Sequence, residues 1–150
     1  MTRGTIRISL KIAVSAVTLF YGFVPAIADL NDTHLFNPLW SPHARFHGAW
    51  FLAFTAGVAF IALYLTWLRD DLVVPIFLGL MFALGFWVAT VFGPAYGGAL
   101  VDPNGHTQTV LGIESNLFLF SMLTLLLIAA LSFALWIGGA KSAPAELSYP

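Results

Sequence analysis

Hydrophobic residues fall along the chain into four long segments that contain no Asp, Glu, Lys or Arg. These segments are residues 12–28, 46–68, 72–101 and 115–140. A helix needs about 20 apolar residues to cross roughly 30 Å of hydrocarbon, and the last three segments reach that length. The first is shorter, but Lys11 can extend its ammonium group to the membrane surface and so lengthen the span towards Ile6. The pattern therefore predicts four transmembrane helices.

The segments lack the alternation of apolar and polar residues that is typical of membrane β-strands, since residues 123–131 read Leu-Thr-Leu-Leu-Leu-Ile-Ala-Ala-Leu. We therefore expect an all-α integral membrane protein, in which residues 1–150 form a single transmembrane domain with a four-helix bundle. The predicted spans are 6–27, 46–68, 73–96 and 113–138, the polar loops are 28–45 and 97–112, and the disordered tail is 142–150.

Basic residues predict the orientation of this bundle. Five of the six Lys and Arg residues lie at the end that carries both chain termini, whereas Arg45 lies at the other end. Lys and Arg are enriched on the cytoplasmic side of membrane proteins. Both termini are therefore predicted to be cytoplasmic, and in a bacterial host the protein would be a multi-pass protein of the inner or plasma membrane.

Composition excludes several functional classes. Charged residues make up only 9% of the chain and the formal net charge is -1, so there is no basic surface for nucleic acid. The absence of cysteine excludes disulfides, thiolate catalysis and cysteine-ligated zinc or iron–sulfur clusters. The lipid bilayer is the partner that composition predicts.

Residues 1–28 also fit a second interpretation. A basic start, an apolar middle and Ala26-Ile27-Ala28 before Asp29 are typical of a secretory signal peptide that is cleaved after Ala28. Cleavage would leave three spans with unchanged orientation. We favour retention of this segment, because an A-x-A triplet arises often by chance in a chain rich in alanine.

All four histidines and four of the acidic residues are predicted to lie at the end opposite the termini. They are His34, His43, His47, His106, Asp29, Asp32, Asp102 and Glu114. His43 and His47 stand four residues apart at the start of a helix, which places both imidazoles on one face, as in many pairs of metal-binding histidines. With Glu114 as a third ligand they form a candidate site for a divalent metal ion. A structural polar cap is the alternative interpretation.

The loop before the second span carries further candidates. The residues expected to bind a small ligand or a lipid headgroup are His34, Trp40, His43, Arg45 and His47. Trp40 would anchor the loop at the membrane interface, and Arg45 can hold a phosphate or carboxylate through paired hydrogen bonds. An acid at the membrane boundary is a functional candidate by default. Glu114 with His43 or His47 is therefore the acid–base pair expected if the protein is an enzyme.

The most distinctive motif of the chain lies at residues 33–47, Thr-His-Leu-Phe-Asn-Pro-Leu-Trp-Ser-Pro-His-Ala-Arg-Phe-His. It resembles the T-H-x-x-N-P-x-W-x-P-H-A-[RK]-F-H signature of a family of small, uncharacterised membrane proteins of bacteria and fungi. The resemblance implies four membrane spans and no particular activity. A looser similarity, in helix count and Glu114 alone, is to sterol-isomerase and sigma-receptor-like membrane proteins, which bind sterols or lipophilic amines in a pocket with buried carboxylates.

Three functional hypotheses follow. The leading one is the binding of a small ligand, a lipid headgroup or a metal ion at the polar cap. The second is an enzyme that acts on a lipophilic substrate, although the chain lacks H-E-x-x-H, G-x-S-x-G and G-x-x-x-x-G-K-[ST] motifs. The third is a structural subunit, because Ala89, Gly93 and Gly97 are small residues four apart and could pack against a partner helix or a second copy.

Overall fold

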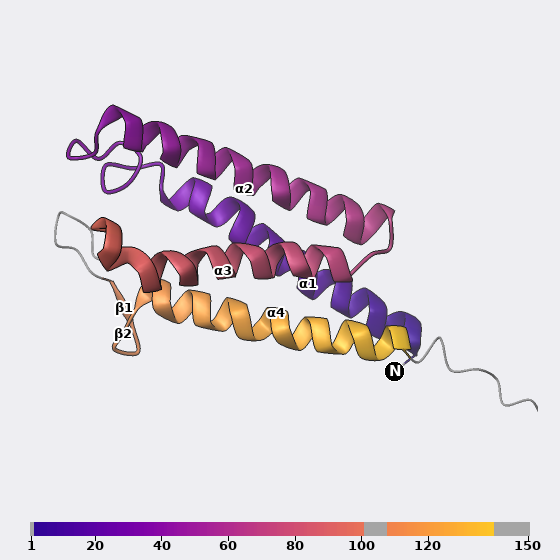
Figure 1. The fold of residues 1–150 in the computed structure, drawn as a ribbon. Helices are drawn as coiled ribbons and strands as arrows, with labels where there is room; N and C mark the ends of the chain where they lie inside the picture. The colour runs from indigo at the N-terminus through magenta and orange to yellow at the C-terminus, as the bar shows by residue number, and fades with distance from the viewer. Residues whose placement is uncertain (1, 101–107, 140–150) are drawn as a thin grey trace, which may run out of the picture.

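The protein is a bundle of four long helices (Figure 1). The structure is a computed structural model that describes residues 2–100 and 108–139. Its helices are α1 (Arg3–Ala28), α2 (Pro42–Leu68), α3 (Val73–Tyr96) and α4 (Ser115–Gly139). All four are long and apolar enough to cross a membrane, which confirms the predicted all-α transmembrane fold. Asp102, His106 and the predicted tail at 142–150 lie outside the described residues.

Local sequence signals set several helix boundaries. At the start of α2 the Ser41 hydroxyl accepts a hydrogen bond from the backbone N–H of Ala44 at 3.2 Å, and Pro42 occupies the first helical turn, where its missing N–H is not needed. The helix therefore begins at Pro42, ahead of the predicted membrane span, which starts at residue 46. Helix α3 begins and ends where the sequence predicts. It stops at Gly97, whose φ of 74° is left-handed and free of strain for glycine.

A short antiparallel hairpin precedes α4. Its strands, β1 (Thr109–Val110) and β2 (Ile113–Glu114), are joined by Leu111 and Gly112, with φ values of 55° and 80°. Positive φ at both turn residues is typical of the type I′ turn that closes two-residue hairpins. The sequence predicts the end of a loop and the start of a span in this stretch, so the hairpin is a correction. Helix α4 begins only at Ser115.

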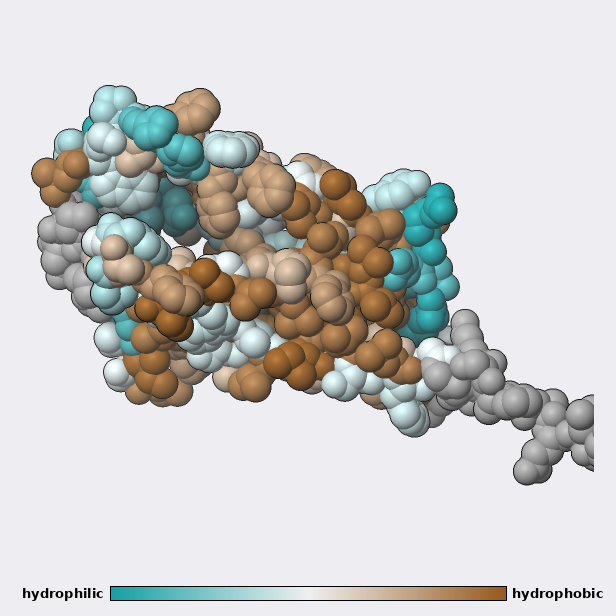
Figure 2. All heavy atoms as spheres, in the orientation of Figure 1, coloured by the Kyte–Doolittle hydropathy of each residue, from teal (hydrophilic) through white to brown (hydrophobic). Residues whose placement is uncertain are grey.

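The two ends of the bundle carry its polar surface. The end where α1 stops and α2 and α4 begin is termed the cap end, and the opposite one the terminal end. Figure 2 shows hydrophilic atoms gathered at both ends and hydrophobic atoms between them. At the terminal end the Asp70 carboxylate lies 2.8 Å from Nη2 of Arg7 and 2.6 Å from Nζ of Lys11. Asp70 has a left-handed φ of 55°, which Asp tolerates better than most residues.

The closely packed core lies mainly in the terminal half of the bundle. Gly22 of α1 packs directly on Ala59 of α2, and Gly79 of α3 faces the side chains of Leu127 and Tyr21. Small residues let membrane helices approach this closely. The buried hydrophobic cluster consists of Leu10, Val14, Tyr21, Leu72, Ile76, Ala83, Leu123, Leu127 and Ala134. Most of these residues lie in the terminal halves of their helices, so the helices are held together best there.

Candidate functional site

The segment between α1 and α2, residues 29–41, is a compact set of turns at the cap end and is termed the cap segment. Oδ1 of Asn31 accepts hydrogen bonds from the backbone N–H groups of Thr33 and His34, at 2.8 and 3.1 Å. The side chain of Asn37 is fully buried. It donates to the backbone oxygen of Thr33 and accepts from a backbone N–H two residues later, both at 3.0 Å. These amide contacts give the segment a defined shape.

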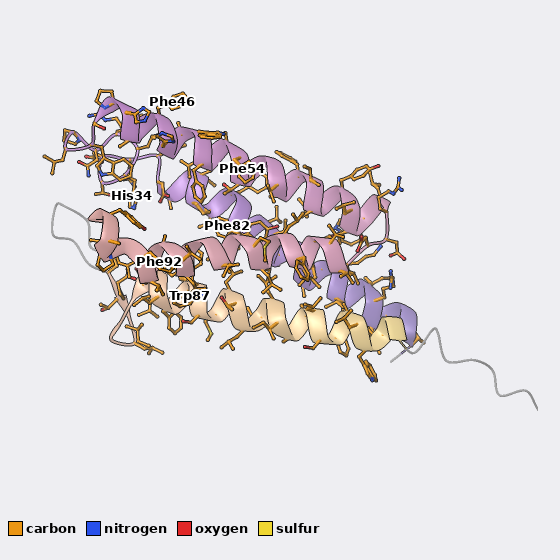
Figure 3. All side chains as sticks on the ribbon, viewed as in Figure 1. His34, Phe46, Phe54, Phe82, Trp87 and Phe92 are labelled. Carbon is orange, nitrogen blue, oxygen red and sulfur yellow. The ribbon has the colours of Figure 1, made fainter. Side chains whose placement is uncertain are left out.

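Asp29 and His34 lie where the cap segment meets the helices. Nε2 of His34 is 3.8 Å from Oδ1 of Asp29, and its Nδ1 is 2.8 Å from the Thr33 hydroxyl. Burial raises the pKa of the Asp29 carboxyl above its ordinary value, and the charge of a protonated His34 opposes that rise. His34 itself is about half exposed at the cap end (Figure 3). The acid is therefore partly desolvated while its imidazole neighbour reaches water.

His43 and His47 form a close pair on the first turns of α2. Their Nε2 atoms are 3.0 Å apart and their rings are perpendicular, so one imidazole donates a hydrogen bond and the other accepts it. Both side chains are exposed. Two nitrogens bound to one tetrahedral zinc ion would stand about 3.3 Å apart. The two imidazoles therefore lie side by side, as their spacing in the sequence predicts.

Glu114, the expected third metal ligand and catalytic acid, caps the start of α4. One carboxylate oxygen accepts a hydrogen bond from the backbone N–H of Leu117 at 2.9 Å, and the other accepts from Nδ2 of Asn116 at 3.0 Å. A carboxylate in this position satisfies N–H groups that the helix leaves free. In the described part of the chain no three His, Asp or Glu side chains are grouped to hold a metal ion. The structure therefore does not bring Glu114 to the histidine pair.

Trp40 and Arg45 are expected to contact a ligand or a lipid headgroup. Trp40 belongs to the cap segment, and Arg45, on the first turn of α2, lies against it. Trp40 lines a crevice of about 120 Å³ together with Asp29 and His34. Nη2 of Arg45 lies 3.5 Å from the backbone oxygen of Pro38, and its buried Nε has no hydrogen-bond partner among residues 2–100 and 108–139. Binding of an anionic headgroup by Arg45 stays a prediction.

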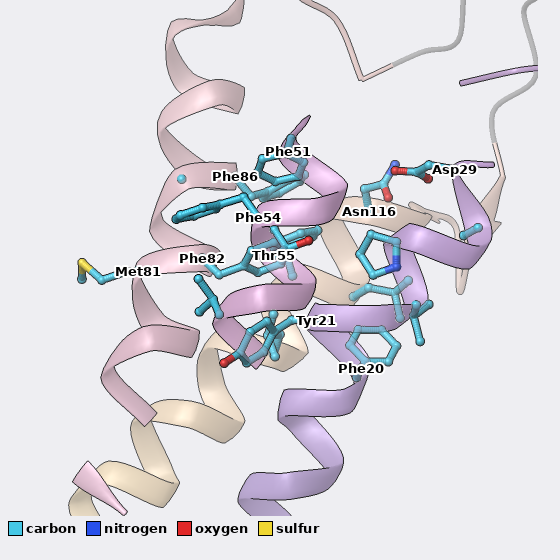
Figure 4. Close-up of a pocket in the computed structure, with 18 of the residues that line it drawn as sticks. Phe20, Tyr21, Asp29, Phe51, Phe54, Thr55, Met81, Phe82, Phe86 and Asn116 are labelled. Atoms are coloured by element: carbon cyan, nitrogen blue, oxygen red, sulfur yellow. The ribbon is translucent and has the colours of Figure 1, made fainter. Parts of the chain in front are cut away.

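A larger cavity, of about 620 Å³, lies between the helices beneath the cap segment (Figure 4). All four helices line it, mostly with aromatic and aliphatic side chains. Asp29 and Asn116 stand at its cap end, and Tyr21 and Thr55 line it nearer the middle of the bundle. The Tyr21 hydroxyl is buried, and within the described chain it has no hydrogen-bond partner. The cavity is therefore an apolar space with polar groups near its two ends.

Phe82 joins the walls of this cavity. Its ring stacks on those of Tyr21 from α1, Phe51 from α2 and Phe120 from α4, with centroid separations of 5.2, 6.1 and 5.6 Å. Figure 3 shows Phe82 in the space between α2 and α3. Each aromatic pair of this kind stabilises a fold by about 0.5–1.5 kcal/mol beyond the area that it buries. Phe82 of α3 thus contacts each of the other three helices and holds them in position around the cavity.

The sequence profile of a family of unknown function (DUF6640) matches residues 11–135. The chain belongs to this family. The match confirms that the chain is a member of an uncharacterised family. It stays a prediction that the motif at residues 33–47 is the signature of this family. No curated protein and no solved structure matches the chain. The DUF6640 region includes the cap segment, the histidine pair and every residue that lines the large cavity.

The small residues expected to form a seam have roles within the chain. Gly97 is the left-handed residue that ends α3, and a Cβ atom on Gly93 would lie 3.1 Å from the backbone oxygen of Gly98. Ala89 lines the cavity, and its backbone oxygen accepts a hydrogen bond from the Tyr96 hydroxyl at 2.8 Å. These contacts account for both glycines without a partner. Association of helices or copies through this face stays a prediction.

Most residues of the cavity carry no signal that sequence reasoning could use. Phe82, Met81 and Phe51 are of the same types as the residues that face lipid, and a search for ionisable groups passes over them. The sequence places Asp29 among the acidic residues at the end opposite the termini, but nothing in the sequence singles it out from them. Asn116 stands next to Glu114 at the membrane boundary, and of the other polar lining residues it is the one whose position could indicate the site.

Proposed function

We propose that this DUF6640 protein binds a small lipophilic molecule in the interhelical cavity, with the polar end of the molecule at Asp29 and Asn116. The observation that carries the proposal is the cavity itself, about 620 Å³ in volume and lined by all four helices. Ligand sites in proteins are typically apolar spaces of about 300–1,000 Å³ with a few well-placed polar groups.

The size of the space argues against incidental loose packing. Protein interiors are packed about as densely as organic crystals, and voids larger than a water molecule are few. The aromatic wall around Phe82 shows that the neighbouring side chains are ordered on one another. An apolar cavity bordered by such a wall is more favourable when an apolar molecule fills it, because the lining then gains dispersion contacts.

The polar groups near the cap end favour a ligand that donates a hydrogen bond. The carboxylate of Asp29 accepts hydrogen bonds, and burial disfavours its charge, so a hydroxyl or an amine would compensate for the lost water. A ligand carboxylate would instead meet a like charge. The looser similarity to sterol- and amine-binding proteins rests on Glu114, which does not line the cavity, and so does not carry this preference.

The enzyme hypothesis built on Glu114 with His43 or His47 gains no support from this cavity, because none of the three residues lines it. The orientation is part of our proposal: the cap end is non-cytoplasmic, and the termini are cytoplasmic in the inner or plasma membrane. Arg7 and Lys11 at the terminal end support it. Because the chain has no cysteine, single cysteines placed at positions 34 and 69 would report the two sides through an impermeant thiol reagent.

Binding can be tested with three twelve-carbon probes that share a tail and differ in the polar end: dodecanol, dodecylamine and dodecanoate. Each probe carries a photoreactive diazirine in its chain, and adducts are mapped by mass spectrometry in lipid nanodiscs. We expect saturable adducts at cavity residues with the alcohol and the amine, and few with the carboxylate. Val58→Trp, which fills the cavity from α2, should weaken labelling about tenfold, a loss of about 1.4 kcal/mol.

Val88→Trp is the matched control, because Val88 is 47% exposed and does not line the cavity. It should label as the wild type does. Labelling that does not saturate, or that is equally strong in Val58→Trp, would show that the probes report on bulk lipid and that the protein has no binding site in the cavity.

A further inference from the structure

We infer that the cavity opens sideways into the membrane, through a portal between the cap-end halves of α2 and α3, and that its ligand is therefore a molecule dissolved in the hydrocarbon of that leaflet. The inference rests on the proposed function and specifies the source of the ligand and its route. Four observations lead to it, and each concerns a different part of the cavity wall.

The first observation is the exposure of the cavity lining on α2 and α3. Phe51, Phe54 and Met81 line the cavity, yet 51%, 62% and 50% of their surface is exposed. A closed chamber would bury its lining. Figure 2 shows the surface hollowed between α2 and α3 towards the cap end. The cavity and the lipid-facing surface are thus continuous at this place.

The second observation is the divergence of the two helices. Residues 69–72 join α2 to α3 at the terminal end, where Figure 1 shows the two helices close together. From there they separate towards the cap end, so that their ribbons are farther apart beside the cavity than at the connecting turn (Figure 1). The space between the two helices therefore widens towards the cap side of the membrane.

The third observation is the small size of the side chains on the α3 edge of the portal. Gly85 and Ala89 both line the cavity and are exposed. A Cβ atom built on Gly85 would meet no other atom within 4 Å, so the glycine is not required for helix packing. Its effect is to leave the gap unobstructed. On the opposite side of the cavity, between α1 and α4, the exposed lining includes the bulkier Phe20, Val24 and Leu119, and Ala28 and Asn116 are exposed only at its cap end.

The fourth observation is the obstruction of the route from water. The cap segment lies over the cavity, held by the buried side chain of Asn37, and the crevice beneath it measures only about 120 Å³. The depth of the cavity also fits a ligand from lipid. It extends from Asn116 to Leu123 along α4 and from Leu78 to Ala89 along α3, about 11 and 17 Å at 1.5 Å per residue, which is close to the thickness of one leaflet, about 15 Å.

The opening can be tested without any ligand. Gly85→Cys gives a single cysteine in a chain that has none, and a nitroxide label attached to it in nanodiscs reports its collisions with oxygen and with a water-soluble nickel chelate. We expect strong relaxation by oxygen, which dissolves in hydrocarbon, and little by the nickel chelate. The reverse pattern would show a water-filled entrance and overturn the inference.

The route can be tested by the rate at which the diazirine-bearing dodecanol reaches the cavity. Gly85→Phe should slow the appearance of cavity adducts about tenfold, as a barrier rise of about 1.4 kcal/mol would. Gly57→Phe is the matched control, since Gly57 also has no atom within 4 Å of a built Cβ and does not line the cavity. It should leave the rate unchanged.

Two further outcomes separate the claims. An unchanged rate in Gly85→Phe, with a slow rate in Leu119→Trp, would place the entrance between α1 and α4 and overturn the inference while the proposed function stands. If the wild type gives no saturable cavity adducts at all, the proposed function fails, and the nitroxide measurement at position 85 still decides whether the cavity is open to lipid.

Discussion

The methyl group of Ala59 on α2 packs so closely on Gly22 of α1 that no side chain would fit at position 22. The contact lies immediately beside Tyr21, and Thr55 is one turn away on α2. It therefore fixes the two helices relative to each other at the deep end of the cavity.

This contact predicts that Gly22→Ala destabilises the protein. A Cβ atom would collide with that of Ala59, and overpacking of this kind typically costs about 1–3 kcal/mol. The measurement is the midpoint of thermal unfolding in detergent. Adding Ala59→Gly should restore most of the loss because it removes the opposing methyl group. Gly57→Ala, in open space, serves as the control, and equal destabilisation by both alanine variants would contradict a specific contact.

A second prediction concerns the ion pairs at the terminal end. Hydrogen bonds from Arg7 and then Lys11 lower the pKa of Asp70 to about 2. Because the folded-state pKa is depressed, the stabilisation is present above the ordinary value of 3.8 and is lost as the pH falls towards 2. Asp70→Asn should therefore lower stability at neutral pH, by at most about 1 kcal/mol since the carboxylate is largely solvated.

The difference in stability between Asp70→Asn and the wild type should disappear as the pH falls to about 2. It should also become smaller in high salt. Combining Asp70→Asn with Lys11→Gln tests the pairing directly. Losses that add fully, rather than overlapping, would show that the two side chains stabilise the protein independently.

Asp29 gives the opposite pH dependence. Burial raises the pKa of its carboxyl above 3.8, so the folded protein holds this proton more tightly than the unfolded chain does. The contribution to stability is complete below the unfolded value and is lost as the pH rises through the folded one. Asp29→Asn should therefore stabilise the ligand-free protein at neutral pH, by about 1 kcal/mol or less for a partly exposed group.

The gain in stability of Asp29→Asn over the wild type should disappear in acid. Labelling of the same variant by the dodecylamine probe should fall. Asp32→Asn, at an exposed position of the cap segment, is the control and should change neither quantity. A variant that is less stable than the wild type at neutral pH would show that the charge of Asp29 is favourable where it stands.

The packing of α1 predicts that residues 1–28 are retained. Leu10, Val14, Thr18 and Tyr21 are all buried in the bundle, and cleavage after Ala28 would remove them together with one wall of the cavity. Intact-mass measurement of the membrane-extracted protein should give the full 16.3 kDa chain. Ala28→Leu, which blocks an A-x-A site, should have the same length. A shorter wild type beside a full-length variant would establish cleavage.

The histidine pair predicts weak binding of zinc. His43 and His47 have their Nε2 atoms 3.0 Å apart, which suits two ligands of one ion. Titration calorimetry should show binding that is lost in His43→Ala and in His47→Ala. Glu114→Gln should leave it unchanged, because that carboxylate caps α4. An equal loss in Glu114→Gln would instead support the site of three ligands.

The positions of the helices could be predicted because membrane solvation acts on whole segments. A charge-free run of sufficient length has to be helical in hydrocarbon, and Ser41 with Pro42 marks a helix start by local chemistry alone. The hairpin before α4 escaped prediction, since its turn depends on a left-handed Leu111, a residue type that rarely adopts this conformation.

The candidate site was predictable only in its polar part. The spacing of His43 and His47 gives their proximity, because helix geometry alone decides it. The partner of Glu114 could not be foreseen, since its carboxylate has backbone N–H groups of its own helix within reach. The cavity depends on the distance between α2 and α3, which arises from the packing of all four helices and leaves no trace in any single segment.

The tight core lies mainly towards the terminal end of the bundle and the cavity towards the cap end, and Tyr21 and Leu123 belong to both. Residues such as Ile76 and Leu127 hold the helices together, whereas Met81 and Phe54 line the cavity and are exposed. Substitutions at Met81 or Phe54 should therefore change the shape of the cavity at little cost to stability, so the cavity can be redesigned without rebuilding the fold.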